Sequence, residues 1–130
     1  MYARDRAARH LSIEITGVAP GRAQARVTVA DSMVNGHDVA HGGYVFLLAD
    51  TAFAFACNTY GQVTLASAAD VVFVAPARSG DELVAEAVER GRYGRSGIYD
   101  VTVRRVGDGA VVAEFRGHSR SQNERLLDDG

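Results

Sequence analysis

The chain is poor in several residues that mark particular classes of protein. Its 130 residues include one cysteine, Cys57, two prolines and no tryptophan. A single cysteine excludes a disulfide within the chain and fits a reducing compartment. The formal net charge at pH 7 is only −2. So small a charge excludes a general attraction to nucleic acid or to an anionic membrane.

The chain also lacks a long apolar run. Residues 1–6 carry charges of both signs and lead into no apolar stretch of the kind that a signal peptide contains. The most apolar stretch, residues 42–57, is too short to span a bilayer and contains Asp50 near its middle. A chain of this length forms one domain with a core of its own. These features predict a soluble, cytoplasmic protein with a single domain over residues 1–130.

The chain is rich in alternating apolar and polar residues, which are typical of half-buried strands. The pattern predicts a brief helix over residues 3–10 and one long helix over residues 42–58. Six strands are expected, at residues 11–16, 23–30, 64–74, 83–90, 98–106 and 110–120. Residues 91–97 are expected to form a loop, and the polar residues from Ser121 onward a flexible tail.

The long helix predicts how these strands are arranged. An antiparallel sheet needs a cover on at least one face, and the helix over residues 42–58 is the only element that is apolar enough to provide it. A sheet that curves around the helix buries the apolar side chains of both. The predicted fold class is therefore α+β, with a curved antiparallel sheet wrapped around one long central helix.

Asp50 is the one acidic residue in this helix of apolar and small residues. Burying a carboxylate costs several kcal/mol unless it is paired, so its presence there indicates a function. Asn35 and His41 come shortly before Gly42, at the helix N-terminus, where free N–H groups and the helix dipole stabilise negative charge. A carboxylate together with such donors is the equipment for attack on a carbonyl group. A structural role for Asp50, neutralised by an arginine or a hydroxyl, is the alternative.

The spacing of Gly42 and Asp50 indicates where that carbonyl group binds. Eight residues of helix separate the two by roughly 12 Å, whereas both must come to about 3 Å from one carbonyl group. The antiparallel helix of a second subunit would bring its Asp50 opposite the Gly42 amide. The sequence therefore predicts an active site shared by two subunits. Whether Asp50 attacks as a nucleophile or acts as a general base on water stays open.

Short pieces of the chain, spread over nearly its whole length, carry a resemblance to a known family. They are Asn35 with His41-Gly42-Gly43, Leu48-Ala49-Asp50, Ala56-Cys57-Asn58, Phe73-x-x-Pro76, Gly97-x-Tyr99-Asp100 and Phe115-Arg116-Gly117-x-Ser119. Through them the chain resembles the hotdog-fold acyl-CoA thioesterases, most closely the PaaI-type group of phenylacetate catabolism. The combination of pieces is far more specific than His-Gly-Gly alone.

The resemblance implies a reaction and an assembly. The reaction is hydrolysis of aryl-type coenzyme A thioesters, such as phenylacetyl or hydroxyphenylacetyl thioesters, to the free acid and CoA. The enzyme is expected to be a homotetramer with no metal and no cofactor, since coenzyme A is part of the substrate. Ser67 lies where related enzymes place a Ser or Thr facing the catalytic carboxylate of the other chain, and a register error of one residue would point it away. Thr64 is the weaker substitute.

The remaining candidates each have a structural alternative. Asn35 either orients a water or the carbonyl group, or only ties a loop. His41 either donates a hydrogen bond near the leaving sulfur or caps the helix. Gly43 either lets the substrate approach the backbone or only permits a tight helix entry. His37 and His41 have metal-ligand spacing on a helix but no third ligand, so no metal is expected.

Two groups of residues are candidates for binding the substrate. Phe46 and Phe53 either line an aryl pocket or belong to the core. The loop residues Arg92, Arg95, Ser96 and Gly97 either hold the phosphates or adenine of coenzyme A or form a solvated turn.

Two other functions compete with thioester hydrolysis, because a fold does not determine a function. A hydratase or dehydratase of the same fold would pair a His with an acid across the dimer, usually with a Pro-rich segment after the His. Here His41 runs directly into Gly42-Gly43. A non-catalytic acyl-CoA binding module would need no acid at Asp50. The glycines after His41 therefore count against the hydratase, and the acid in the helix counts against the binding module.

Overall fold

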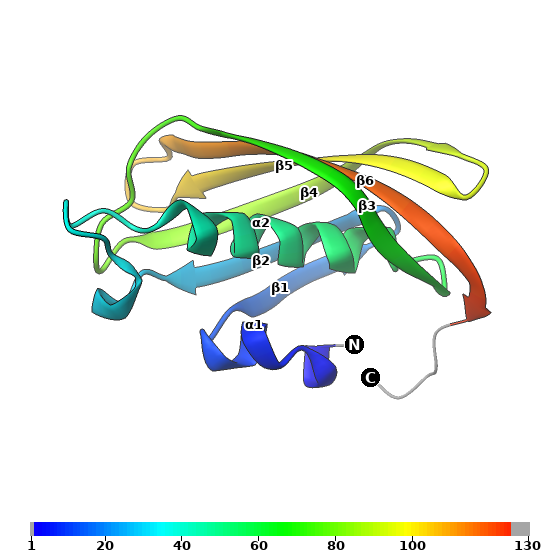
Figure 1. The fold of residues 1–130 in the computed structure, drawn as a ribbon, viewed down its shortest axis with the longest axis horizontal. Helices are drawn as coiled ribbons and strands as arrows, with labels where there is room; N and C mark the ends of the chain where they lie inside the picture. Colours follow the sequence, from blue (N-terminus) through cyan, green and yellow to red (C-terminus); the bar gives the residue numbers. More distant parts are fainter. Residues whose placement is uncertain (1, 126–130) are drawn as a thin grey trace.

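The structure is a computed structural model that describes residues 2–125, with side chains as far as Gln122. One antiparallel sheet of six strands surrounds a central helix (Figure 1). The elements in chain order are η1 (Tyr2–Arg4), α1 (Arg6–His10), β1 (Glu14–Ala19), β2 (Arg22–Thr28), η2 (Asp31–Met33), α2 (Gly42–Cys57), β3 (Gln62–Phe73), β4 (Glu82–Tyr93), β5 (Ser96–Arg105) and β6 (Val111–Arg125). This confirms the predicted α+β hotdog fold.

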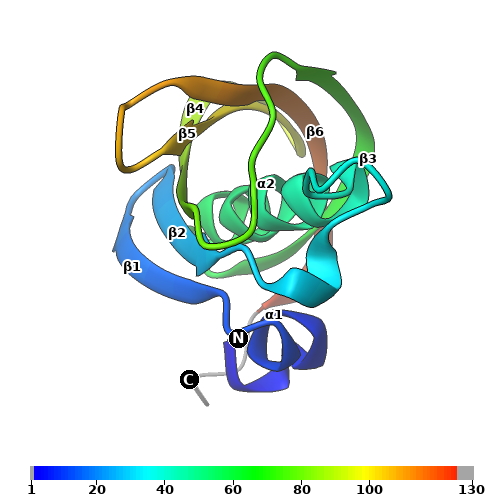
Figure 2. The same ribbon diagram turned by 90° about the vertical axis from the view of Figure 1, so that its left-hand side faces the viewer.

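The strand order across the sheet is β1-β2-β4-β5-β6-β3. β3 follows α2 in the chain, yet it pairs with β6 and forms the edge opposite β1. Seen from one end, the sheet curves around α2 (Figure 2). This order places β3 beside α2 and leaves β3 at a free edge of the sheet, while α1 and Tyr2 also pack against α2. Among residues 2–125, no helix is long and apolar enough to cross a membrane.

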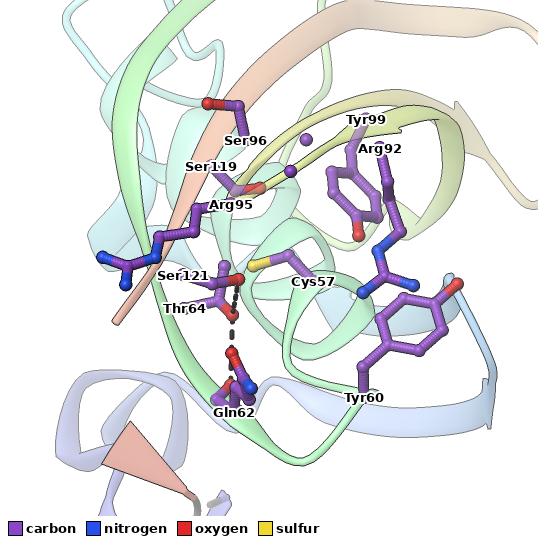
Figure 3. Close-up of a pocket in the computed structure, with 12 residues that line it drawn as sticks. Cys57, Tyr60, Gln62, Thr64, Arg92, Arg95, Ser96, Tyr99, Ser119 and Ser121 are labelled. Atoms are coloured by element: carbon purple, nitrogen blue, oxygen red, sulfur yellow. Dashed lines mark hydrogen bonds between the residues drawn. The ribbon is translucent and has the colours of Figure 1, made fainter. Parts of the chain in front are cut away.

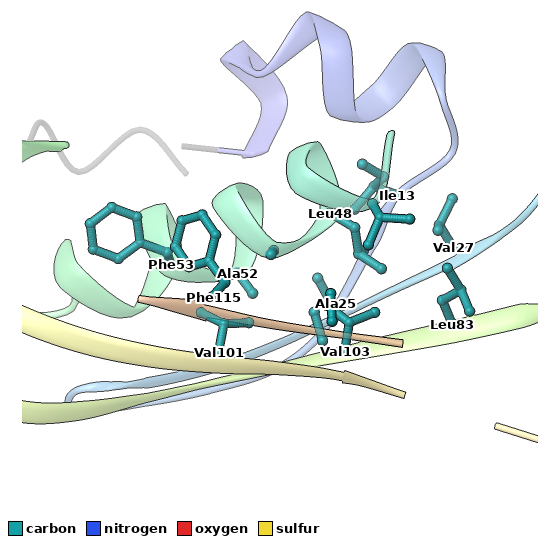
Figure 4. Close-up of a cluster of buried hydrophobic side chains, with 14 of the residues drawn as sticks. Ile13, Ala25, Val27, Leu48, Ala52, Phe53, Leu83, Val101, Val103 and Phe115 are labelled. Carbon is teal, nitrogen blue, oxygen red and sulfur yellow. The ribbon is translucent and has the colours of Figure 1, made fainter. Parts of the chain in front are cut away.

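The core lies between α2 and the concave face of the sheet (Figure 4). Leu48 and Phe53 of α2 are buried, as are Val101 and Val103 of β5, which point inward because successive side chains of a strand alternate between faces. Burying one such side chain stabilises the fold by roughly 1.5–3 kcal/mol. The apolar alternation that predicted the strands thus corresponds to real burial.

The structure corrects the loop that was expected at residues 91–97. β4 runs on to Tyr93 and β5 begins at Ser96, so the connection is a tight hairpin in which Gly94 has a φ of +63°. Gly91 sits at a register shift between β4 and β5. Gly97 is within β5, where a Cβ would come within 2.7 Å of the Ser119 hydroxyl oxygen. The glycines that suggested a loop instead serve a bulge and a close contact inside strands.

The two ends of the chain also differ from the expected pattern. Residues 11–13, expected to begin the first strand, close α1 instead, where Ser12 has a φ of 59° and β1 begins only at Glu14. β6 continues past Ser121 and pairs with β3 as far as Gln62↔Arg125. The tail was expected to be flexible from Ser121, so strand pairing extends into it. The remainder of that tail, residues 126–130, lies outside the described residues.

Candidate active site

Asp50 lies in a pocket of about 270 Å³ between α2 and the start of β3. The pocket, called the Asp50 pocket below, is lined also by Phe53, Ala54, Cys57, Asn58 and residues 63–66. The carboxylate has no hydrogen bond or ion pair within the described part of the chain. Burial raises the pKa of Asp50 above its ordinary value, and the negative charge of Asp5 raises it further. The arginine or hydroxyl that a structural role requires is absent among residues 2–122.

Gly42 begins α2, about two helical turns before Asp50. No side chain caps the helix, and the N–H groups of Gly42 and Gly43 have no hydrogen-bond partner among the described residues. A Cβ on Gly42 would come within 2.8 Å of the Phe73 ring, so any other residue there requires the ring or the helix entry to shift. The helix therefore presents free N–H donors at its positive end, beside an aromatic ring.

A second pocket, of about 420 Å³, adjoins Gly42 and is called the Gly42 pocket below. It is lined by Val39, Val45 and residues 73–77 at the end of β3 and just after it. The two pockets therefore lie at opposite ends of β3. The structure does not bring Asp50 and Gly42 of one chain together, because about 12 Å of helix separates them.

Asn35 ties the loop that precedes α2. Its side-chain carbonyl oxygen accepts hydrogen bonds from the N–H groups of His37 (2.9 Å) and Val39 (3.3 Å). Its side-chain NH2 group has no partner in the described part of the chain and keeps its donors. The side chain of His41 is exposed and does not cap the helix. No group of residues suited to hold a metal ion occurs among those that the structure describes.

Ser67 occupies a bulge in β3. Ala66 pairs with Ser119 and Ala68 with His118, so Ser67 is the extra residue between them. Its hydroxyl donates a hydrogen bond to the His118 carbonyl oxygen at 3.1 Å and is exposed. A bulge re-aims the side chains around it, which strict alternation cannot predict. Ser67 thus lies on the edge strand β3, and its hydroxyl is hydrogen-bonded to His118 and not to Asp50 of its own chain.

The two phenylalanines that were candidates for an aryl pocket belong largely to the core. Phe53 is 1% exposed and its ring packs against those of Tyr99 and Phe115, with centroid distances of 5.6 and 5.8 Å. Phe46 packs edge-on against Phe115 at 5.3 Å. Phe53 still lines the Asp50 pocket, whereas Gly43 is exposed, with open space where a Cβ would stand.

The β4–β5 hairpin covers a third cavity, of about 230 Å³, which we call the hairpin pocket (Figure 3). Arg92, Arg95, Ser96 and Gly97 all line it, so the structure brings these four predicted residues together. The Arg92 guanidinium stacks 3.7 Å from the centroid of the Tyr60 ring, and its Nε lies 3.9 Å from a Glu89 carboxylate oxygen. Arg95 has no ion pair in the described part of the chain.

The residues that form the interior of the hairpin pocket were not predicted to form a pocket, although Thr64 was named as a substitute for Ser67. They are Cys57 at the end of α2, Thr64 of β3, Tyr99 of β5, and Ser119 and Ser121 of β6. The alternation along β6 contained a signal for Ser119, because it continues the buried series of Phe115 and Gly117. The alternation predicts that the Ser119 hydroxyl is buried. It cannot predict the pocket, because α2, β3 and β5 also form its walls.

Known proteins resemble this chain in sequence and in structure. The family model of the thioesterase superfamily matches residues 37–112. Acyl-coenzyme A thioesterase PaaI of Escherichia coli is 42% identical over 119 residues, which cover 92% of this chain and 84% of that protein. A solved structure of the E. coli PaaI protein from the phenylacetic acid degradation operon superposes with a TM-score of 0.94 at 39% identity, over 98% and 91% of the two chains. A PaaI variant from Thermus thermophilus does so with a TM-score of 0.84 at 33% identity, over 94% and 100%.

Proposed function

Because the chain belongs to the thioesterase superfamily and is a thioester hydrolase of the acyl-CoA type, we propose that it acts on compact aryl-acetyl coenzyme A thioesters and releases the free acid and CoA. One observation carries the proposal. Asp50 is a half-buried carboxylate with a raised pKa and no partner among the described side chains. A fold does not maintain so costly a group for packing alone, and a base of raised pKa is suited to activating water near neutral pH.

The active site is proposed to be shared by two subunits. β3 is an edge strand, and Leu65, Val72 and Phe73 expose more than half of their side-chain surface along it. An edge with exposed apolar side chains is suited to pairing with another chain. Two β3 strands that pair antiparallel about their middle would place the start of one against the end of the other. The Asp50 pocket of one subunit then faces the Gly42 pocket of its partner.

This arrangement accounts for the chemistry. The free N–H groups at Gly42 polarise the thioester carbonyl oxygen and stabilise the negative charge that develops on it. Asp50 of the other subunit either takes a proton from a water that attacks the carbonyl carbon, or attacks it directly to form an anhydride that water then cleaves. The C–S bond breaks in either case, and the thiolate leaves without needing a strong acid. The NH2 group of Asn35 and the Ser67 hydroxyl are candidates to orient the water, and His41 to approach the sulfur.

The pockets and the family both support the proposed substrate class. The Asp50 pocket is small and mainly apolar, with Phe53, Ala54 and Leu65 in its lining. It suits a compact aryl group better than a long chain, and a pocket of this kind selects by about 1–3 kcal/mol per methylene. For the phosphates of coenzyme A, Arg95 is the better candidate, because Arg92 is already engaged by Tyr60 and Glu89. The tetramer implied by the family remains part of the proposal.

The test is a panel of acyl-CoA thioesters with a reagent that detects free thiols. Phenylacetyl-CoA should release CoA faster than palmitoyl-CoA does, and a preference for palmitoyl-CoA would contradict the substrate class. Binding of acyl-CoA without thiol release would indicate a binding module instead. Addition of water to an enoyl-CoA, again without thiol release, would indicate a hydratase.

A further inference from the structure

Ser119 leaves an unused hydrogen bond inside the hairpin pocket. Its side chain is 4% exposed, and its hydroxyl has no partner among the described residues. Its position is set from both sides, because it pairs with Gly97 of β5 and with Ala66 of β3. A Cβ at Gly97 would come within 2.7 Å of the hydroxyl oxygen, so glycine keeps the space beside it open. The hydroxyl lines the cavity and is not sealed off from it, so a ligand group in the pocket can take up this hydrogen bond.

The interior of the pocket is polar but uncharged. The Thr64 and Ser121 hydroxyls are hydrogen-bonded to one another at 3.1 Å. Burial raises the pKa of the Cys57 thiol to about 12, so it stays protonated. The Tyr99 hydroxyl donates to Glu89. Such surroundings suit a neutral group that can donate and accept hydrogen bonds.

The charged side chains lie at the mouth of the pocket. The Arg92 guanidinium rests on the Tyr60 ring, and the Arg95 side chain extends away from Cys57 and Ser119 (Figure 3). An anion in the interior would therefore lack a direct cationic partner. This favours a hydroxyl over a phosphate or carboxylate as the group that Ser119 meets.

The hairpin pocket also adjoins the Asp50 pocket. Cys57 and Thr64 line both of them. Cys57 follows Asp50 by seven residues of helix, a distance of about 10 Å. An aryl-acetyl group whose carbonyl carbon lies at Asp50, and whose ring points toward the end of α2, covers most of that distance. A substituent on the far side of the ring would then reach the shared boundary.

We propose that the hairpin pocket receives the end of the acyl group farthest from the thioester, and that Ser119 selects acyl groups with a neutral hydrogen-bonding substituent there, such as a ring hydroxyl. This proposal rests on the proposed function and adds to it the residue that binds the end of the acyl group farthest from the thioester. The acyl group and CoA leave the carbonyl in opposite directions. The phosphates of the same substrate then lie away from the hairpin pocket that holds its acyl end, so a contact with Arg95 requires the Arg95 of another subunit.

The first test compares phenylacetyl-CoA with its 2-, 3- and 4-hydroxy derivatives. The wild-type enzyme should favour a hydroxyl remote from the thioester. Ser119→Ala should lower kcat/KM for that substrate about fivefold to tenfold, the worth of one hydrogen bond, and leave phenylacetyl-CoA within about twofold. Ser32→Ala, at an exposed serine far from the pockets in sequence, is the matched control. It should leave kcat/KM unchanged for both substrates. If Ser119→Ala kept the preference for the hydroxylated substrate, the proposal would be overturned. It would also be overturned if Ser119→Ala lowered kcat/KM equally for every acyl group, because coenzyme A would then occupy the pocket.

A second test uses only the wild-type protein and measures binding, so it depends neither on turnover nor on whether a variant folds. The backbone amide signals of Ser119 and Gly97 in the wild-type protein are followed by NMR during titration with 4-hydroxyphenylacetate and with phenylacetate. The hydroxylated acid should shift them more strongly, and equal or absent shifts with both acids would refute the assignment. If the wild-type protein releases no thiol from any acyl-CoA, the proposed function fails, and this titration still decides what the pocket binds.

Discussion

Two regions of this molecule treat a carboxylate in opposite ways. On the outer face of the sheet, Asp100 accepts two hydrogen bonds from Arg116, at 2.7 and 2.9 Å, and lies 3.3 Å from Arg90. The hydrogen bonds from Arg116 hold the pKa of Asp100 below its ordinary value. In the pocket between α2 and β3, Asp50 has no such partner among residues 2–122, and burial raises its pKa. The fold can supply partners for a carboxylate, and their absence at Asp50 among residues 2–122 supports the catalytic role that we propose for it.

The largest expected effect comes from removing the unpartnered charge. Asp50→Asn keeps the shape and should lower kcat by about 10²–10⁴, the range for loss of a general base, with KM little changed. Asp100→Asn is the matched control, since it removes the paired carboxylate and should leave kcat within about twofold. Steady-state kinetics of both variants measure the contrast. Comparable losses in the two variants would erase the distinction between the regions.

The shared site predicts recovery when two inactive variants are mixed. Gly42→Pro removes the N–H donor at a position where helices tolerate proline, and its ring also displaces Phe73, whereas Asp50→Asn removes the acid. Each mixed dimer regains one intact site, so free subunit exchange should restore about a quarter of wild-type activity. Circular dichroism and native mass spectrometry must first show that both variants fold and exchange. No recovery after proven exchange would place the whole site within one chain.

A smaller loss is expected from adding a methyl group at the start of α2. In Gly42→Ala the new Cβ meets the Phe73 ring, so the helix entry or the ring must shift, and kcat should fall about tenfold or more. Gly43→Ala is the matched change at the next residue, where a Cβ meets nothing, and it should cost much less. Phe73→Leu in the Gly42→Ala background should recover part of the activity. If Gly42→Ala and Gly43→Ala lowered kcat equally, the contact with Phe73 could not be the cause of the loss.

The pH dependence should reflect the raised pKa of Asp50. kcat/KM should fall as the pH drops through that raised pKa, because only the ionised form acts. Asp5→Asn removes the nearby negative charge and should move this acidic limb to lower pH. The change keeps the N-cap of α1, since asparagine also accepts the hydrogen bond that Asp5 takes from the Ala8 N–H at 2.9 Å. An unmoved limb would show that burial alone sets the pKa.

The smallest effects concern stability and run in opposite directions. Folding lowers the pKa of Asp100, so its ionised carboxylate stabilises the fold at every pH above the pKa of the unfolded chain. That stability is lost as the pH falls through the lower pKa of the folded protein. The pKa of Asp50 is raised, so its ionisation removes stability as pH rises through the folded pKa. Near neutral pH, Asp50→Asn should therefore raise the melting temperature slightly and Asp100→Asn lower it slightly. Thermal melts at pH 4 and pH 7 measure both.

Much of the fold was accessible from local pattern. The helix over residues 42–58 is observed as Gly42–Cys57, and each of the six expected strands has an observed counterpart. Periodicity predicts these elements because it reports which side of a segment is buried. The loop predicted at residues 91–97 was wrong, because glycines inside a strand look like turn residues until their cross-strand neighbours are known. The roles of Asp50, Gly42, Asn35, His41 and Ser67 in catalysis remain predictions.

By itself the sequence determined the elements, the apolar central helix and the place of one acid within it, because each depends on residues close together in the chain. Only the tertiary structure decided that Asp50 lacks a partner among residues 2–122, that Gly42 lies against Phe73, and that Ser119 opens onto a pocket beside Gly97. Each of these facts joins residues that strand pairing or packing of α2 brings together from distant positions. Local periodicity carries no record of which strand pairs with which, nor of the bulges that shift their register.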